Sequence, residues 1–247
     1  MSQIKQELEL HGADCLYSNN KLAVSTAHKK ITFFISGEHF DFEKHAGTLV
    51  IPEDQLIRQP EILSGIFLSR LNLNRKIFAR QCELRKIDRS VSEAFLNNWH
   101  LMGATQSAFN LGLYFKDKLV CVASFSKGRK MDRLPEDQRS FELIRFCTMP
   151  GVTVTGGLTK LIRHFCKEKQ AGDLMTYVDR QLSDGASFLK AGFEKYGETA
   201  PNYFLINRSN FERTAVKSKD VSFDHKLFYL TQNLGNIKLV YTPFEKL

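Results

Sequence analysis

The sequence contains no apolar run near the ~20 residues that a membrane-spanning helix needs. Its first residues, MSQIKQELEL, include no apolar stretch typical of a signal peptide. The five cysteines form no CxxC pair and no Cys/His spacing typical of a zinc site. We therefore expect a cytoplasmic protein with reduced thiols, no membrane partner and no metal centre.

The chain also lacks an excess of acidic residues. Lys and Arg together number 35 against 27 Asp and Glu, which gives a net charge of +8 and a pI of about 9.2. This excess favours polyanionic partners such as nucleic acid or an acidic cofactor, although a basic soluble protein without such a partner remains the alternative. With 247 residues and 43% apolar content, the chain is long enough for one large domain or two small ones.

Short elements are predicted up to about residue 80. The pattern indicates a helix over residues 3–10 and strands over residues 22–25, 31–36 and 48–51. Pro60 suits the first turn of a further helix, whose apolar positions 62, 63, 66, 67 and 71 share one face. Residues 75–87, RKIFARQCELRKI, are interpreted as one charged strand.

A mixed α/β order follows. Ser90 with Glu93 predicts a capping box on a helix that runs to about residue 102. The remaining expected elements are a hairpin over residues 108–115 and 119–125, a strand over 141–148, helices over 158–168 and 185–191, and strands over 174–178, 194–197 and 203–206. Counted from residues 82–87, the order is β-α-β-β-β-α-β-α-β. The polar tail from Ser209 is expected to pack back on the body through its last apolar segment, LVYTPF.

The segment TVTGGLTKL places two glycines between a Val/Thr run and an amphipathic helix. Free N–H groups and the helix dipole attract phosphate at such a helix N-terminus, and glycine lets the backbone approach the anion closely. The same pattern also serves as an ordinary corner.

The element order, this glycine turn and the later GASFLKAGFEKYGE together resemble the GNAT acyltransferase fold. In that superfamily the loop (Arg/Gln)-x-x-Gly-x-(Gly/Ala) binds the pyrophosphate of coenzyme A. Here Gly156 matches, whereas Thr153 replaces Arg or Gln and Leu158 replaces the small residue. Many members carry a general-acid Tyr in the late helix, where this chain has Phe188, which has no proton to donate.

A narrower resemblance rests on seven ordered blocks: KIFARQCEL, NWHLMG, GLY, ELIRFC, GGxxKL, YxDR and PNY. They are similar to phage-encoded Hef-like homing endonucleases that carry a GNAT-like region related to Mom DNA-modification proteins. The resemblance implies transfer of a group from acetyl-CoA or a related acyl-CoA to a nucleobase amine of DNA. The base has to be flipped out or single-stranded to reach the site.

In that group a nuclease-like region precedes the GNAT-like part. The corresponding strand here, residues 30–37, carries no acidic residue, and Asp41, Glu43 and Lys44 follow in what is interpreted as a solvated loop. The expected fold class is therefore α/β (α+β): a GNAT-like mixed sheet with flanking helices, preceded by a small, reduced nuclease-like α/β region. The predicted domains are residues 1–78 (non-cutting or DNA-contacting), 79–208 (GNAT-like) and 209–247 (C-terminal extension).

Candidate catalytic residues lie near the ends of the predicted parallel strands, where open α/β sheets bind ligands. They are Arg145, Tyr177, Asp179 and Tyr203. For Arg145 the alternative is a structural ion pair with Glu142 or Asp179, and for Asp179 it is a cap or ion pair. His100 is interpreted mainly as a packing or cap residue at a helix end.

The cofactor site is predicted from the glycine turn and its neighbours: Cys147, Thr153, Thr155, Gly156, Gly157 and Lys160. The predicted nucleic-acid contacts are Lys127, Arg129, Lys130, Arg133 and Arg180. Most of them lie in one polar loop that is equally compatible with a solvated segment. Two other functions stay open: a catalytically reduced DNA-binding accessory and a plain N-acyltransferase for a protein or small amine.

Overall fold

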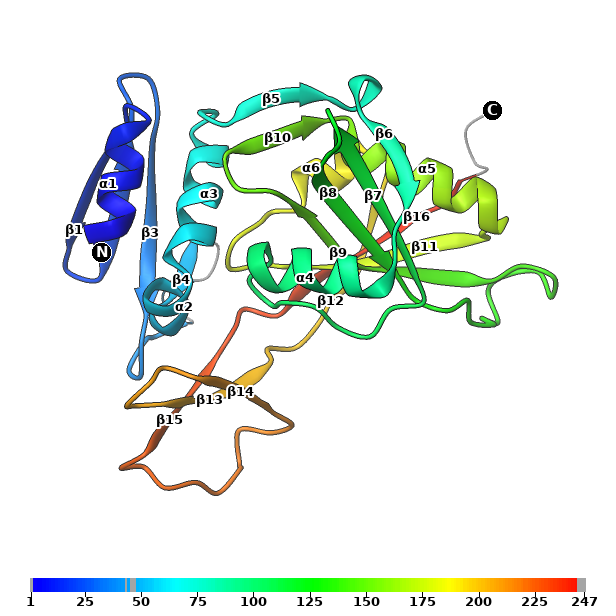
Figure 1. The fold of residues 1–247 in the computed structure, drawn as a ribbon. Helices are drawn as coiled ribbons and strands as arrows, with labels where there is room; N and C mark the ends of the chain where they lie inside the picture. The colour runs from blue at the N-terminus through cyan, green and yellow to red at the C-terminus, as the bar shows by residue number, and fades with distance from the viewer. Residues whose placement is uncertain (1, 43, 45–47, 244–247) are drawn as a thin grey trace. The chain divides into compact units, whose positions relative to one another are not determined.

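The structure, a computed structural model, describes residues 2–42, 44 and 48–243 (Figure 1). It divides into two compact units. Unit 1 comprises Met1–Leu73, Val178–Asp184 and Glu198–Ile237, and unit 2 comprises Asn74–Tyr177, Gly185–Gly197 and Lys238–Leu247. No helix within the described ranges is long and apolar enough to cross a membrane.

Unit 1 begins with helices packed on a small sheet. Its first elements are α1 (Ser2–Leu10), β1 (Asp14–Ser18), β2 (Lys21–Ser25), β3 (Lys30–Ser36), β4 (Val50–Pro52), α2 (Glu53–Arg58) and α3 (Pro60–Arg70). The strands form a sheet in the order β1-β2-β3-β4, antiparallel except for the parallel pair β3–β4. Phe33 of β3 and Phe67 of α3 are fully buried with ring centroids 4.8 Å apart, so the helix covers the sheet through aromatic packing.

The second part of unit 1 is a separate antiparallel sheet in the order β14-β13-β15. Its strands are β13 (Tyr203–Asn207), β14 (Arg213–Val216) and β15 (Phe228–Gln232). Arg213 of β14 donates through Nε and Nη2 to the two carboxylate oxygens of Asp54 in α2, each at 2.7 Å. Both side chains are largely buried, so this bidentate salt bridge connects the second sheet to the helices of the same unit.

Unit 2 is built around a mixed sheet in the order β12-β16-β11-β9-β8-β7-β6 (Figure 1). Its elements are β5 (Arg75–Phe78), the short 3₁₀ helix η1 (Ala79–Gln81), β6 (Glu83–Lys86), α4 (Arg89–Trp99), β7 (Phe109–Phe115), β8 (Lys118–Phe125), β9 (Ser140–Thr148), β10 (Val152–Thr155), α5 (Gly157–Lys169), β11 (Asp173–Asp179), α6 (Ala186–Lys190), β12 (Glu194–Glu198) and β16 (Asn236–Tyr241). From β6 to β12 the chain follows the expected order β-α-β-β-β-α-β-α-β, with β10 added before α5. The α+β class is therefore confirmed.

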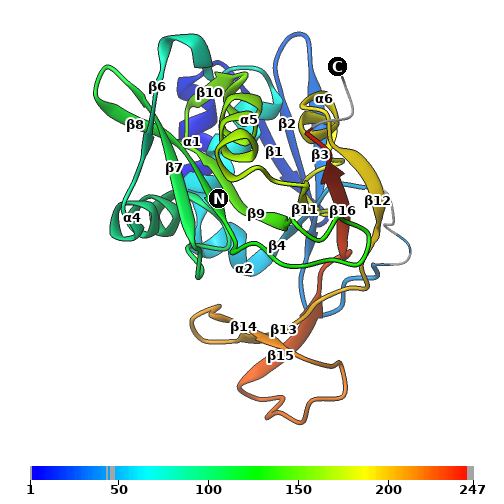
Figure 2. The ribbon, with the colours of Figure 1, turned by 90° about the vertical axis from the view of Figure 1, so that its right-hand side faces the viewer.

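Helices cover both faces of this sheet. On one face, Phe95 and Leu96 of α4 pack with Val122 of β8 and Cys147 of β9. On the other face, Phe165 of α5 stacks on Phe125 with ring centroids 3.8 Å apart. Since alternate residues of a strand point to opposite faces, Val122 and Phe125 meet different helices. Figure 2 shows α4 and α5 on either side of the strands β7 and β8.

Several sequence expectations are corrected in unit 2. Residues 75–87 are two strands, not one: β5 and β6 are separated by η1 and belong to different sheets. The predicted capping box on Ser90 is wrong, because Asp88 is the N-cap residue and Glu93 instead accepts a hydrogen bond from Arg89 at 2.6 Å. The strand predicted at residues 203–206 does not join this sheet but pairs with β14 and β15.

The C-terminal part of the chain was expected to pack on the body, and it also supplies a strand of the central sheet of unit 2. This strand, β16, lies between β11 and β12, although it follows both of them by many residues in the sequence. Residues 244–247 of the predicted extension and Glu43 of the N-terminal loop lie outside the described residues.

Candidate functional site

The parallel strands β9 and β11 pair only at their beginnings. Their register comprises Asp173↔Ser140, Leu174↔Phe141 and Met175↔Glu142. Both strands continue, β9 to Thr148 and β11 past Tyr177, but beyond these pairs they are no longer partners in the ladder. The sheet of unit 2 therefore opens at the carboxyl ends of its parallel pair, where open α/β sheets bind ligands.

A side chain marks the point where the strands part. The buried hydroxyl of Thr176, the first residue of β11 after the ladder, donates to the carbonyl oxygen of Leu143 in β9 at 2.9 Å. This bond occupies the first carbonyl of β9 past the paired residues. The opening thus begins at a fixed position.

The edge of β9 beyond its pairs with β11 is further shaped by a bulge. Ser124 of β8 pairs with Arg145, whereas its neighbour Phe125 pairs with Leu143, so Ile144 is an extra residue on β9. On the side facing away from β8, the backbone groups of residues 144–148 are not matched by β11. An open strand edge of this kind can bind an extended ligand that carries amide groups.

The glycine turn precedes α5 in the same unit. Gly156 is the N-cap residue with φ 77°, a left-handed conformation that favours glycine, and α5 begins at Gly157. Gly156 and Thr155 are exposed, Thr153 is half-buried on β10 opposite Lys76, and Gly157 is buried against Val154. The first N–H groups of α5 have no partner inside the helix and can bind an anion.

Lys160, predicted as a cofactor contact, is engaged with the protein backbone. Its ammonium donates to the carbonyl oxygens of Ala79 at 2.9 Å and Cys82 at 2.6 Å, which lie in and after η1. The parallel pair β5–β10 joins the same two segments. Lys160 therefore fixes the first turn of α5 against the β5–η1 segment.

Arg145 and Cys147 point to the face of the sheet covered by α4. The Arg145 guanidinium donates to the carbonyl oxygens of Gly103 at 3.1 Å and Ile144 at 3.0 Å, and it forms no ion pair with Glu142. The Cys147 thiol donates to the Trp99 carbonyl oxygen at 3.2 Å, and burial raises its pKa to about 12. Cys147 is therefore a neutral thiol at neutral pH and not a thiolate nucleophile.

His100 is the residue that ends α4, as expected for a cap. Its Nδ1 accepts a hydrogen bond from the Met102 N–H at 3.1 Å. Burial, with a contribution from the Arg145 charge, lowers the pKa of His100 to about 4. The imidazole is therefore neutral at physiological pH.

The other predicted catalytic residues are divided between the units. Tyr177 belongs to unit 2, where it is 42% exposed just beyond Thr176. Asp179 belongs to unit 1, accepts hydrogen bonds from the Gln181 N–H at 2.8 Å and Asn233 Nδ2 at 3.4 Å, and has its pKa raised by burial. Tyr203 starts β13, where it pairs with Val216 and Gln232.

The predicted nucleic-acid contacts have different local surroundings. Lys127 is exposed, while Arg129 and Lys130 are 66% and 69% exposed beside Glu142 and Glu136 at about the limit of ion-pair distance. Arg133 instead donates to the buried carboxylate of Asp173 at 2.5 Å. In unit 1, Arg180 pairs with Glu198 at 2.7 Å and donates to Leu234 O at 3.2 Å.

The late helix α6 carries no hydroxyl at Phe188. This phenyl ring packs edge-on against Phe193 with centroids 5.6 Å apart. In the described ranges no group of three or more His, Cys, Asp or Glu side chains is arranged to hold a metal ion.

Solved structures resemble this chain over about two-thirds of its length. A GNAT family acetyltransferase from Elizabethkingia anophelis, with acetyl-CoA bound, is 12% identical with a TM-score of 0.38 and covers 66% of this chain and 98% of its own. An IAA acetyltransferase from Bacillus cereus is 13% identical with a TM-score of 0.40 and covers 65% and 99%. Naa50 from Arabidopsis thaliana, in complex with a bisubstrate analogue, is 11% identical with a TM-score of 0.42 and covers 66% and 99%.

No protein-family profile and no curated protein sequence matches the chain. At the identities and TM-scores given above, the structural likenesses transfer no activity or substrate to it. The narrower resemblance to homing endonucleases and Mom proteins stays a prediction.

Proposed function

We propose that unit 2 is an acyl-CoA-dependent acyltransferase of the GNAT type. The observation that carries this proposal is the parting of β9 and β11 after three residue pairs, in a unit whose helix α5 follows a left-handed glycine. The open edge of β9 suits the amide-bearing arm of CoA, and the N-terminus of α5 suits its pyrophosphate. When bound, acyl-CoA supplies an activated thioester.

The residues assigned to this cofactor act in two groups. Thr155, Gly156 and Gly157 present backbone N–H groups at the start of α5 to the pyrophosphate. Thr153 lies two residues before Thr155 on β10, Lys160 holds the turn through η1, and Cys147 supports β9 from the α4 side. Of these six residues only those of the glycine turn contact the ligand directly, while the backbone edge of β9 contacts its amide-bearing arm.

Proton transfer requires a group other than Phe188. Tyr177 is the candidate donor in unit 2, because it follows Thr176 at the point where β11 leaves β9 and its side chain is exposed. Asp179 and Tyr203 belong to unit 1, and their catalytic roles stay predictions from the sequence. The raised pKa of Asp179 brings this carboxyl closer to the range of a general base.

The acceptor we propose is the exocyclic amine of a nucleobase in DNA. The support is the net charge of +8 together with the exposed cations Lys127, Arg129 and Lys130 beside β9. Exposed cations with weak ion pairs are free to contact phosphates.

The first test is binding of acetyl-CoA to the purified chain. Saturating acetyl-CoA at about 100 times its Kd stabilises a protein by about 2.7 kcal/mol, so we expect the melting temperature to rise by about 5–10 °C. Desulfo-CoA and AMP serve as ligand controls. No stabilisation by acetyl-CoA at any concentration contradicts the acyltransferase proposal.

The second test is nucleoside analysis of DNA from cells that make the protein. A mass increase on one nucleoside that disappears in Tyr177→Phe supports base modification. Modification of protein or small amines alone contradicts the nucleobase acceptor while keeping the acyltransferase.

Phe188 favours one alternative, a DNA-binding accessory without catalysis. Its phenyl ring is packed against Phe193 and cannot donate a proton. Salt-sensitive DNA binding with neither acetyl-CoA binding nor a modified nucleoside supports this alternative.

A further inference from the structure

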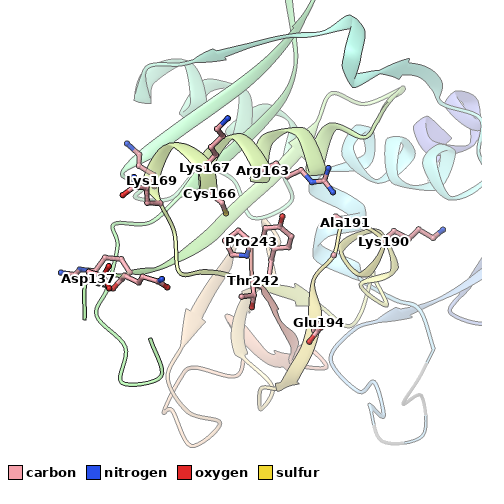
Figure 3. Close-up of a pocket in the computed structure, with 15 residues that line it drawn as sticks. Asp137, Arg163, Cys166, Lys167, Lys169, Lys190, Ala191, Glu194, Thr242 and Pro243 are labelled. Atoms are coloured by element: carbon pink, nitrogen blue, oxygen red, sulfur yellow. Dashed lines mark hydrogen bonds between the residues drawn. The ribbon is translucent and has the colours of Figure 1, made fainter. Parts of the chain in front are cut away.

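Unit 2 contains a second candidate site at some distance along the helix from the glycine turn. A hollow of about 1170 Å³ lies beside the C-terminal half of α5, the end of α6 and the end of β16 (Figure 3). It is larger than the ~300–1,000 Å³ typical of small-molecule pockets. None of its lining residues belongs to the predicted cofactor residues of the glycine turn or of β9.

The charge of the lining is uneven. Five cationic side chains and two acidic side chains line the hollow, the acids being Asp137 and Glu194. Two of the cations are engaged elsewhere: Arg139 donates to the carbonyl oxygen of Glu136 at 2.7 Å, and Lys169 pairs with Glu168 at 3.1 Å.

The remaining three cations are Arg163, Lys167 and Lys190. All are exposed, and among the described residues none of them has a hydrogen-bond or ion-pair partner. Arg163 and Lys167 are four residues apart on α5, where like charges repel one another. An anionic ligand removes this repulsion.

The directions of these side chains favour an extended ligand over a small enclosed one. In Figure 3, Arg163 reaches from α5 toward Ala191, whereas Lys167 and Lys190 extend outward from the rim. A small ligand inside the hollow meets Arg163 but not all three cations. A phosphate chain that runs along the rim contacts each of them.

An aromatic ring completes the lining. Tyr241, at the end of β16, is half-exposed and packs on Phe193 with centroids 5.5 Å apart. Gly192 lies under the same ring with φ +102°, and a Cβ at this position would be only 3.2 Å from the ring. A fixed, partly exposed aromatic ring beside free cations is the combination that binds single-stranded nucleic acid, through stacking and phosphate contacts.

We infer that the α5–α6 hollow binds a single-stranded nucleic-acid segment, with its phosphates along Arg163, Lys167 and Lys190 and a base against Tyr241. The inference rests on the proposed nucleobase acceptor for the class of ligand. It adds a binding surface separate from the opening between β9 and β11. Glu194 repels phosphate, so the predicted path follows the two helices and not β12.

The test is binding of a fluorescein-labelled single-stranded DNA of about 20 nucleotides, long enough for a groove of this type, to the full chain. The test variant is Arg163→Glu/Lys167→Glu, and the matched control is Lys116→Glu/Lys118→Glu in the exposed β7–β8 turn, which changes the net charge equally. We expect at least about tenfold weaker binding for the test variant, with a salt slope lower by about 2, and less than about twofold change for the control. All substituted residues are exposed, and the melting temperature confirms folding.

Two further variants and one competitor sharpen the result. Tyr241→Leu is expected to weaken binding by about fivefold or more through lost stacking, and Glu194→Gln to strengthen it. Equal losses in the test and control variants, or no loss in the test variant, overturn the inference. Displacement of the DNA by millimolar inorganic phosphate also overturns it, because it indicates a small-anion site.

The outcome is separable from the proposed function. Acetyl-CoA stabilisation is measured on the same variants and is expected to be unchanged in Arg163→Glu/Lys167→Glu. If acetyl-CoA fails to bind the wild-type chain while this variant loses DNA binding, the acyltransferase proposal falls and the nucleic-acid surface stands.

Discussion

The hydroxyl of Thr176 donates a hydrogen bond to the backbone carbonyl oxygen of Leu143 at 2.9 Å. Leu143 directly follows Glu142, the last residue of β9 that pairs with β11, and Thr176 directly follows its partner Met175. A single side-chain bond thus replaces the next ladder contact. It lies at the position where the two strands separate.

Replacing this hydroxyl tests its positioning role. Thr176→Val keeps the shape but leaves the Leu143 carbonyl oxygen without its donor, which costs about 1–3 kcal/mol of stability. We expect acetyl-CoA to bind at least about tenfold more weakly to Thr176→Val, while Thr176→Ser, which restores the donor, binds like the wild type. Calorimetric titration measures this difference. Equal affinities for the Val and Ser variants contradict the role.

The left-handed backbone of Gly156 makes a second prediction. With φ 77°, Gly156→Ala is strained by about 1–2 kcal/mol although an added Cβ meets only the Ala79 side chain at 3.7 Å. The expected result is a lower unfolding free energy together with weaker acetyl-CoA binding, because the N–H groups at the start of α5 are displaced. Gly197→Ala is the matched control, since no atom of the described residues lies within 4 Å of a Cβ added at Gly197, which also has no left-handed φ. Unchanged acetyl-CoA binding in a destabilised Gly156→Ala argues against a phosphate site at this turn.

A third prediction concerns Arg133, which sequence analysis assigned to nucleic acid. Its guanidinium meets the carboxylate of Asp173, whose side chain is only 4% exposed. Arg133→Ala leaves this buried carboxylate without its partner, so we expect a loss of about 3 kcal/mol in urea unfolding. The exposed Arg129→Ala is expected to change stability by less than about 0.5 kcal/mol. If Arg133→Ala instead weakens DNA binding without loss of stability, the ion pair is not its main role.

The fourth prediction is a pH dependence of stability. The pKa of His100 is about 4 in the folded protein, below its ordinary value of 6.5, so between these values the unfolded state binds more protons. Stability from this residue is fully present above pH 6.5 and is lost as the pH falls through 4, by roughly 3 kcal/mol. His100→Gln, which cannot titrate, is expected to lose less stability over this range. Parallel slopes for the wild-type and variant proteins from pH 7 to 4 contradict the assignment to His100.

Local sequence patterns predicted the elements that depend on nearby residues. The apolar spacing of α3 and α5 and the hairpin around Lys116 and Asp117 were placed close to their observed bounds, because these signals lie within one element. The strand over residues 75–87 was wrong, because no apolar alternation reveals the turn at η1 between β5 and β6. The partners of β13 and β16 were missed, because local sequence patterns do not indicate which strands from distant parts of the chain pair with each other.

The candidate site shows the same division. The turn at Gly156 was predicted because a glycine between a strand and a helix indicates a backbone conformation that other residues rarely adopt. Thr176 was not singled out, since a threonine within an apolar strand looks like any β-branched residue until its carbonyl partner is known. Likewise, the two carbonyl oxygens that receive the Lys160 ammonium belong to residues about eighty positions earlier, and no spacing rule connects them.

The position of β16 between β11 and β12 has a consequence for synthesis of the protein. A ribosome makes β11 and β12 before the strand that separates them, and the entire β13–β15 sheet of unit 1 lies in the intervening sequence. Until β16 is synthesised, the facing edges of β11 and β12 expose unpaired backbone N–H and C=O groups that can pair with the wrong strand. The nascent chain therefore carries this gap in the sheet from the synthesis of β12 until that of β16, and closure of the gap, a contact of long sequence separation, is a late and slow event in folding.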